Sequence, residues 1–273
     1  MKKHIAYIVM LSILEILLSM YLTEWSAKFW NYVEHKDFHG FLIQIGVFSV
    51  VALAFCIVNA WAGYYITMCA IKWRQVLNKK ALILQGCGAE NTNQRIQQDS
   101  SDYPALMLNV IFGLGKAVVY IVVFSAMLII NYSVIYLLII TSYAIVSTMI
   151  ARYIAKPLIV LNYKTQQAEA TYRNNLTESN FNSCIDIMFG LAIKTKKLSY
   201  FQTLYGQIAV ILPIIIVAPA YFGSALTLGG LMQATRIMGT VTENMSYGIN
   251  SFNQINMLLS CRKRLDEIGM FNK

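Results

Sequence analysis

The chain has 273 residues, of which 57% are hydrophobic and only 13% are charged, and its mean hydropathy is +0.53. Soluble domains usually carry charge on about a quarter of their residues, so the composition excludes an ordinary soluble protein and indicates a membrane protein. The apolar residues come in long runs and do not alternate by twos, which favours transmembrane helices over a β-barrel. The formal net charge of +9 comes from basic residues that flank these runs, so anionic lipid headgroups are favoured over nucleic acid as the partner.

Six apolar runs are long enough to cross a bilayer, because a helix of about 20 residues spans the hydrocarbon core. They cover about residues 5–22, 41–70, 104–130, 133–155, 203–222 and 229–259. The sequence therefore predicts an all-α, polytopic membrane protein with one transmembrane domain over 1–273. Lys2 and Lys3 before the first run are also typical of a secretory signal. However, Glu15 lies in the middle of that run and no small-residue cleavage site follows, so we expect a retained helix.

Basic residues predict the orientation, because Lys and Arg are retained on the cytoplasmic side during insertion. With the first residues inside, only Lys28 and Lys36 fall on the outer side, whereas the other basic residues outside the spans fall on the inner side. We therefore expect a protein of the bacterial inner (cytoplasmic) membrane with both termini cytoplasmic. The inner connections, about 71–103 and 156–202, are rich in helix formers. They are predicted to continue the transmembrane helices into the cytoplasm.

Prolines mark two of the predicted spans. Pro104 is expected in the first turn of the third helix, where its missing N–H is harmless. Pro213 and Pro219 fall inside the fifth run, where each removes a backbone hydrogen bond, and in a membrane the freed carbonyls need a protein or cavity partner. We therefore expect a bent fifth helix that packs against its neighbours. The two prolines are either part of the transport machinery or tolerated kinks.

The last predicted helix carries a polar stripe. At about 100° per residue, one narrow arc collects Arg236, Thr240, Glu243, Tyr247, Asn250 and Gln254, with Gln233 at its edge. Charged groups at mid-membrane cost about 2.5–3.5 kcal/mol each on insertion scales, so Arg236 and Glu243 need compensation. They lie about 10 Å apart along the helix axis, too far for an easy direct contact. The stripe therefore predicts the lining of an aqueous cavity, with a polar contact buried between helices as the alternative.

Glu15 and Lys116 are the other charged residues inside predicted spans. Glu15 is expected to face the same cavity. It either pairs with Lys116 or Arg236 across helices, or it carries an exchangeable proton, as a carboxylate within a membrane can. Glu15 is therefore a candidate for proton coupling, and Lys116 is a candidate cavity-lining residue.

No enzyme chemistry is indicated. The five cysteines show no paired spacing, which argues against a disulfide framework and a zinc ribbon. His35 and His39 have the i, i+4 spacing of a metal-binding pair, but no third ligand is fixed and a solvated loop helix explains them as well. The Gly-Lys pair at 115–116 lacks the spacing of a phosphate-binding loop. We therefore expect no catalytic residue, no metal and no cofactor.

The stretch from Pro213 to Gln233 carries a family resemblance. It reads PIIIVAPAYFGSALTLGGLMQ and includes Pro219 and Gly229. This stretch resembles a pattern, P-x-x-x-VAP-x-YF-x-x-x-x-TLG-x-LMQ, that joins the fifth and sixth helices in one branch of exporter-fold transmembrane domains. That branch contains the SbmA/BacA peptide-uptake permeases and their ATPase-fused relatives, including the peroxisomal fatty-acyl transporters.

Three further stretches agree with this branch in the same order along the chain. In the first inner connection, the residues that match an NPDQRI-x-x-D motif are Asn93, Gln94, Arg95 and Asp99. In the second, the residues that match an E-A-x-Y-R-x-x-L motif are Glu169, Tyr172 and Arg173, followed by Leu176. Arg264-Leu265 resembles the R-L at which fused relatives continue into a nucleotide-binding domain. The resemblance therefore covers nearly the whole chain.

The resemblance implies an ABC-exporter-like transmembrane domain of six helices. We expect no nucleotide-binding domain in this chain, as in the SbmA/BacA permeases, which use the proton gradient and acidic residues in the cavity of a homodimer. Glu15 and Glu169 match acidic positions of the family. The chain departs from the permeases at Gln98 and Asn175, where they carry Glu, so Glu243 is the candidate that replaces a missing carboxylate.

We therefore expect a secondary transporter, coupled to protons through Glu15, Glu169 or Glu243, that imports peptides or peptide-like antibiotics. A homodimer is expected, because one copy has too few helices to enclose a wide cavity, and alternating access would arise from rocking helix bundles. One alternative is the membrane subunit of an ABC transporter whose ATPase is a separate chain. Another is a paralogue that does not transport.

Overall fold

The computed structural model describes residues 2–84, 92–174 and 178–267. Every regular element in these ranges is an α-helix, which confirms the predicted all-α class for this part of the chain. The helices are α1 (Lys2–Glu34), α2 (Phe38–Leu84), α3 (Thr92–Asn131), α4 (Val134–Asn174), α5 (Glu178–Phe222), α6 (Leu228–Met245), α7 (Tyr247–Asn250) and α8 (Phe252–Glu267).

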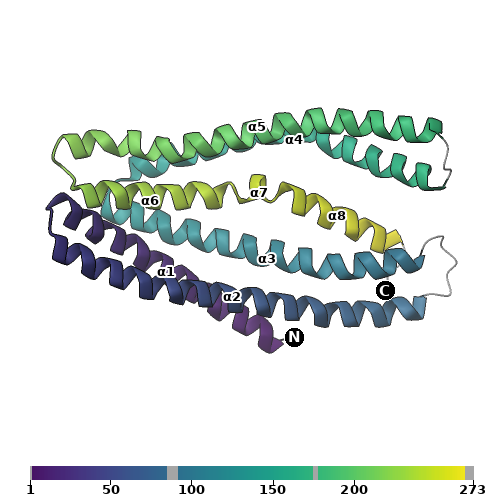
Figure 1. The fold of residues 1–273 in the computed structure, drawn as a ribbon, viewed down its shortest axis with the longest axis horizontal. Coiled ribbons are helices and arrows are strands. Elements are labelled where there is room, and N and C mark those ends of the chain that lie inside the picture. Colours follow the sequence, from purple (N-terminus) through teal and green to yellow (C-terminus); the bar gives the residue numbers. More distant parts are fainter. Residues whose placement is uncertain (1, 85–91, 175–177, 268–273) are drawn as a thin grey trace.

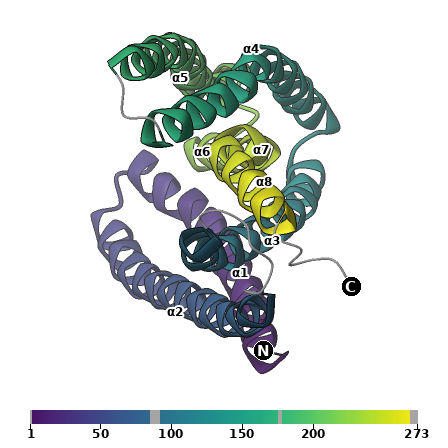
Figure 2. The same cartoon turned by 90° about the vertical axis from the view of Figure 1, so that its right-hand side faces the viewer.

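The helices lie side by side in an elongated bundle (Figure 1). Three short turns, at residues 35–37, 132–133 and 223–227, gather at one end, which we call the short-turn end. The opposite end, where α2 and α4 finish, is the long-arm end. Seen from the long-arm end, α6, α7 and α8 run between the α1–α3 group and the α4–α5 pair (Figure 2). This central position puts α6 in contact with α1, α3, α4 and α5.

Four of the helices are much longer than a bilayer is thick. α2 has 47 residues, α5 has 45, α4 has 41 and α3 has 40. At 1.5 Å per residue α2 alone reaches about 70 Å, whereas the hydrocarbon core measures about 30 Å. The prediction that transmembrane helices continue well beyond the membrane is therefore confirmed, and the α2–α3 and α4–α5 pairs form two long arms.

In the described part of the chain, five helices are long and apolar enough to cross a membrane. The qualifying segments are Lys3–Glu34, Phe38–Lys80, Gln97–Asn131, Val134–Ala151 and Phe181–Phe222. They identify an integral membrane protein. The first is longer than the predicted run 5–22, because α1 continues to Glu34. α6, with 18 residues, does not qualify, so the sixth predicted span is not confirmed by length and composition.

Two expectations about the helices are wrong. The predicted span 229–259 is not one helix, because the regular turns are interrupted at Ser246 and Ser251, which separate α6, α7 and α8. Gly248 and the serines are weak helix formers, and no strong former offsets them in the four-residue α7. Pro104 does not lie in a first turn, because α3 begins at Thr92 and Pro104 is inside the helix. The arm and the span form one continuous helix.

The main hydrophobic core surrounds α6. Its α6 members are Leu231, Ala234, Ile237, Met238 and Val241, and they pack against Phe124, Met127 and Leu128 of α3, Ile140 of α4 and Val217 of α5. A second core near the long-arm end joins α2, α3 and α8 through Leu77, Tyr103, Val110, Leu258, Cys261 and Leu265. α6 is therefore fixed by its apolar face, which determines where its polar face points.

The start of α6 is tied to α1 at the short-turn end. Thr227 caps the helix by accepting a hydrogen bond from the Gly230 N–H. The Gly229 N–H donates to Asn31 Oδ1 at 2.9 Å, and a Cβ at Gly229 would overlap Asn31 and the Ala27 carbonyl of α1. Only glycine allows this close approach, so the position matched by the family pattern has a packing reason.

Candidate functional site

α6 divides its side chains between a buried face and an open face. The buried face holds Gly229, Leu231, Ala234, Ile237, Met238, Val241 and Thr242. Arg236 and Glu243 are exposed in the single chain. An apolar face packed on four helices and two charges on the other side are the pattern that the sequence predicted for this segment, up to the break at Ser246.

A groove of about 420 Å³ runs between α5 and α6. The α5 side of the groove consists of Gln202, Tyr205, Gly206, Ala209, Val210 and Pro213, and the α6 side consists of Thr235, Gly239, Thr242, Glu243 and the following Ser246. Its size lies within the range of about 300–1,000 Å³ that is typical of small-molecule sites. Small residues on both helices leave this space open, and Glu243 gives its lining a negative charge.

Glu243 is the predicted carboxylate that the structure places in this groove. No hydrogen bond or ion pair joins it to another residue in the described ranges. An exposed carboxylate on a helix that packs among membrane-crossing helices requires water, a cation or a polar substrate, since lipid chains solvate none of its charge. Glu243 is therefore the strongest candidate in this chain for a substrate contact or an exchangeable proton.

Of the groove residues, the sequence analysis named only Pro213 and Glu243, and two of those that it missed join α5 to α6. The Tyr205 hydroxyl and Ser246 Oγ share a hydrogen bond between α5 and the end of α6. The Tyr143 hydroxyl of α4 donates to the Tyr205 carbonyl at 2.9 Å, and the two rings stack. A single tyrosine in an apolar run gives no pattern, so only the three-dimensional contact identifies Tyr205 as a groove residue that joins α5 to the end of α6.

The other predicted lining residues are dispersed. Gln233 Oε1 accepts a hydrogen bond from the Tyr132 hydroxyl at 2.8 Å, near the short-turn end. The Thr240 hydroxyl donates to the Arg236 carbonyl within α6. The Tyr247 hydroxyl donates to the Asn109 carbonyl of α3 at 3.4 Å. These three side chains satisfy protein groups and do not line the α5–α6 groove.

The break after α6 separates the remaining members of the stripe from the groove. Gln254 is exposed on α8, and the side chain of Asn250 lies outside the described residues.

Burial raises the pKa of Tyr132, in the turn between α3 and α4, to about 12. That phenol therefore stays a hydrogen-bond donor to Gln233 throughout the physiological range.

Glu15 is paired. Lys116 Nζ lies 3.1 Å from Glu15 Oε2 and 3.3 Å from Oε1, which joins α1 to α3. The Glu15 side chain is 9% exposed and that of Lys116 is 30% exposed. Of the partners considered for Glu15, the structure selects Lys116 and not Arg236. The pair neutralises both charges, so neither is free in this conformation.

Asp99 is the motif residue with a defined contact. The Arg264 guanidinium donates to both carboxylate oxygens, from Nη2 at 2.7 Å and from Nε at 2.9 Å, and thereby fastens α8 to α3. The Arg264 pKa is raised mainly by this hydrogen bond. Beside it, burial raises the pKa of Cys261 to about 11. The two family motifs that contain Asp99 and Arg264 therefore meet in one ion pair.

Several other motif residues are placed by their helices alone. The side chains of Asn93, Gln94, Arg95, Glu169, Tyr172 and Arg173 lie outside the described residues, although their positions are in α3 and α4. Pro213 and Pro219 are both inside the unbroken α5, and Pro213 lines the groove. Within the described ranges no three His, Cys, Asp or Glu side chains are grouped as a metal ion would need.

Comparison with known protein families identifies the family of this chain. The family model described as "ABC transporter transmembrane region 2" matches residues 2–178, about two thirds of the chain. The chain belongs to the ABC transporter transmembrane region 2 family. The matched residues include α1 to α4, whereas the α5–α6 groove lies beyond them. The narrower SbmA/BacA assignment stays a resemblance.

The similar proteins are longer. An uncharacterized ABC transporter ATP-binding protein of Haemophilus influenzae is 27% identical over 276 aligned positions, which cover 84% of this chain and 46% of that protein. The inner membrane ABC transporter ATP-binding protein YddA of Escherichia coli is 21% identical, over 92% of this chain and 54% of its own length. ABC transporter D family member 2, chloroplastic, of Arabidopsis thaliana is 25% identical over 65% of this chain and 28% of that protein. The chain spans about half the length of the first two relatives.

Proposed function

We propose that this ABC transmembrane region moves a substrate through a cavity that two copies enclose beside α6. The observation that carries the proposal is the exposure of Arg236 and Glu243 on a helix surrounded by membrane-crossing helices. Lipid stabilises neither charge, whereas a second copy related by a twofold axis would cover this face and keep water inside. In this arrangement α6 is the sixth crossing, shielded from lipid by protein on every side.

The long-arm end is proposed to be cytoplasmic. Basic residues near this end favour that side, because Lys and Arg are retained in the cytoplasm. Exposed examples on α2 and α5 are Lys72, Lys79, Lys80, Lys196 and Lys197. The short-turn end has few basic residues and would face outward, as expected from the sequence.

ATP hydrolysis is the proposed source of energy. The similar proteins of H. influenzae and E. coli are named ATP-binding proteins, and this chain matches about half of each. The two long arms extend tens of ångströms beyond a bilayer, far enough to carry movement from a nucleotide-binding domain to the cavity. The Asp99–Arg264 ion pair fastens α8 to the first arm, so a rotation of that arm would move α8 and, through α7, α6.

Proton-coupled import of peptides or peptide-like antibiotics is the second candidate. The open position of Glu243 in the groove favours it, because this carboxylate has no hydrogen-bond or ion-pair partner among the described residues and is therefore available for proton exchange. Glu15 supports it less, because Lys116 holds that carboxylate in an ion pair. A polar groove is compatible with peptides, and the choice of cargo here follows the family resemblance.

An uptake assay distinguishes ATP hydrolysis from the proton gradient as the energy source. It measures the entry of a fluorescent cationic peptide into proteoliposomes that contain the full chain. A pH gradient alone should drive no uptake if ATP is required, whereas ATPase activity should co-purify with the chain from native membranes and rise with the peptide. Uptake driven by the pH gradient alone, and lost in Glu243→Gln, would overturn the ATP proposal. Glu24→Gln is the matched control, because Glu24 is an exposed residue of α1 outside the groove.

The shared cavity is tested by crosslinking. A cysteine at Arg236, in a chain without other cysteines, should join two copies through a short bifunctional thiol reagent, because α6 faces its counterpart across the cavity. A cysteine at Ile215, which is 61% exposed on α5, serves as the control on an apolar surface. Crosslinking at Ile215 but not at Arg236 would place the second copy elsewhere and contradict the proposal.

A further inference from the structure

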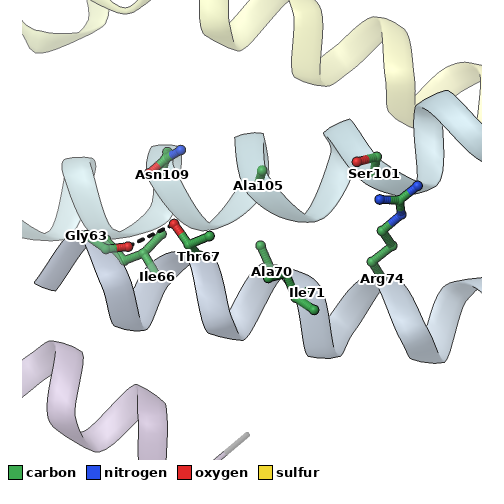
Figure 3. Close-up of a pocket in the computed structure, with 9 residues that line it drawn as sticks. All are labelled: Gly63, Ile66, Thr67, Ala70, Ile71, Arg74, Ser101, Ala105 and Asn109. Atoms are coloured by element: carbon green, nitrogen blue, oxygen red, sulfur yellow. Dashed lines mark hydrogen bonds between the residues drawn. The ribbon is translucent and has the colours of Figure 1, made fainter. Parts of the chain in front are cut away.

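A second groove lies between α2 and α3, apart from the α5–α6 groove. It measures about 340 Å³ and is lined by Gly63, Ile66, Thr67, Ala70, Ile71 and Arg74 of α2 and by Ser101, Ala105 and Asn109 of α3. Figure 3 shows that these residues follow the line where the two helices meet, with Arg74 and Ser101 at one end and Gly63 and Asn109 at the other. Nothing in the transport proposal uses this groove.

The middle of the groove is mostly apolar. Ile66, Ala70, Ile71 and Ala105 form its walls, and Thr67 turns its hydroxyl to the Gly63 carbonyl at 3.0 Å. The threonine hydroxyl is thereby satisfied within α2 and needs no ligand. From Gly63 to Arg74 the groove follows about 16 Å of helix. An elongated hydrocarbon chain fits such a space better than a compact polar molecule does.

One end of the groove carries an incompletely satisfied cation. Arg74 reaches across to α3 beside Ser101 (Figure 3), where its Nη2 donates to the Gln97 carbonyl at 3.3 Å. Arg74 Nε is buried without a hydrogen-bond partner. A buried donor without a partner is costly, and a guanidinium matches phosphate oxygens well. On α3 the Asp99 carboxylate is held by Arg264 of α8, so that acid does not neutralise Arg74.

The cation lies where the uncharged run of α2 ends. The apolar runs of α1 and α2 end at the same level, where Lys72 Nζ contacts His4 Nε2 at 2.5 Å. Lys72 and Arg74 are the first charged residues after the uncharged run 41–71 of α2, and the remainder of the groove runs back along that run and along α3. A ligand at Arg74 would therefore have a charged group at the membrane surface and a hydrocarbon tail in the membrane.

We propose that the α2–α3 groove binds an anionic phospholipid, with the phosphate on Arg74 and Ser101 and one acyl chain between Ala70 and Ala105 toward Gly63. Charge complementarity selects this occupant, because the groove combines an apolar path with a basic end and its lining contains no carboxylate. The bound lipid would fasten α2 to α3 where the first long arm leaves the membrane. The site is independent of the direction and the energy source of transport.

The experiment measures lipid binding to the purified full chain by native mass spectrometry after delipidation. The probes are dioleoylphosphatidylglycerol, which is anionic, and dioleoylphosphatidylcholine, which has the same acyl chains and no net charge. Arg74→Gln removes the charge at the end of the groove, and Lys79→Gln removes an equal charge from an exposed position on α2. Gly63→Leu fills the apolar path, and Gly46→Leu adds the same bulk elsewhere on α2. A Cβ meets no atom within 4 Å at either glycine, so both variants should fold.

The proposal expects different losses at the two ends of the groove. Arg74→Gln should weaken phosphatidylglycerol binding about fivefold and leave phosphatidylcholine unchanged, in line with the energy of one basic residue at a membrane surface. Gly63→Leu should weaken both lipids, and the two control variants should change neither.

Three outcomes would overturn the proposal. Equal effects of Arg74→Gln and Lys79→Gln would show only general surface attraction. Unchanged binding in Gly63→Leu would show that no acyl chain enters the groove. A fall in the dimer fraction in Gly63→Leu, without a change in lipid binding, would show that a second copy of the chain occupies the groove.

Discussion

Replacement of Asp99 by Asn should release α8 from α3. The Asp99 side chain is 4% exposed and accepts two charge-assisted hydrogen bonds from Arg264, whose side chain is 33% exposed. Removal of one partner of a fully buried ion pair costs about 3–5 kcal/mol. Because a third of Arg264 is in contact with solvent, the remaining charge is partly hydrated, and we reduce the expected cost to about 2–3 kcal/mol. The substitution keeps the shape of the side chain, so packing is not changed.

Cys261 reports this release directly. It is fully buried in the contact between α3 and α8, with Arg264 Nη2 3.2 Å from its sulfur. The thiolate is the reactive form, and burial holds the Cys261 pKa at about 11, so alkylation at pH 8 requires local opening. A chain whose only cysteine is Cys261 should therefore react about 30- to 160-fold faster in Asp99→Asn, since each 1.36 kcal/mol of opening free energy is a factor of ten.

The pH profile of the same reaction tests the mechanism. The ordinary thiol pKa is 9.0, and the folded value is higher, so the fold favours the protonated thiol. That preference contributes its full free energy to the stability of the closed state below pH 9, and the contribution is lost as the pH rises from 9 toward 11. The rate through the open state should therefore climb with pH until about pH 11, because ionisation of the exposed thiol makes opening easier as the pH rises above 9. A parent rate that levels off near pH 9 would mean that the fold does not favour the protonated thiol, and equal rates in the two chains would refute the role of the ion pair.

Two further predictions concern stability in detergent, measured by thermal unfolding. Gly229→Ala should destabilise the protein by about 1–3 kcal/mol, because the new methyl group overlaps the Ala27 carbonyl. Gly239→Ala on the same helix should be neutral or stabilising by up to about 1 kcal/mol, because a Cβ there meets nothing within 4 Å, and equal losses would contradict the close approach of α6 to α1. Glu15→Gln and Lys116→Met should each cost about 2–3 kcal/mol, since each leaves a largely buried charge without its partner, whereas the double variant should cost under about 1 kcal/mol. A double variant no better than the single ones would mean that the two residues act separately.

The helical architecture could be predicted from the sequence because apolar runs and helix formers are local signals. The long arms followed from them, and the close spacing of the predicted runs 104–130 and 133–155, and of 203–222 and 229–259, left room only for short connections. The position of Pro104 was predicted incorrectly because proline was taken as a start signal. The arm before it contains enough helix-forming residues to continue the helix, and a single proline inside α3 is tolerated when its surroundings are well packed.

The polar face of α6 was predictable because periodicity separates it from an apolar face. The sequence analysis wrongly extended this polar face through Asn250 to Gln254. That extension assumes an unbroken helix with one fixed angle per residue, and the interruptions at Ser246 and Ser251 change the direction of the residues that follow. Contacts such as Tyr205 with Ser246 depend on how α5 lies against α6, which no local pattern contains. The same is true of the choice of Lys116 as the partner of Glu15.

α6 also constrains how the protein is made. Its two charges alone would cost about 5–7 kcal/mol if the helix partitioned into lipid by itself. It is synthesised after α1, α3, α4 and α5, the four helices that its apolar face contacts. The translocon therefore releases α6 into a site that earlier segments have already built, and a defect in α1 would first become apparent as failed insertion of a helix some two hundred residues downstream.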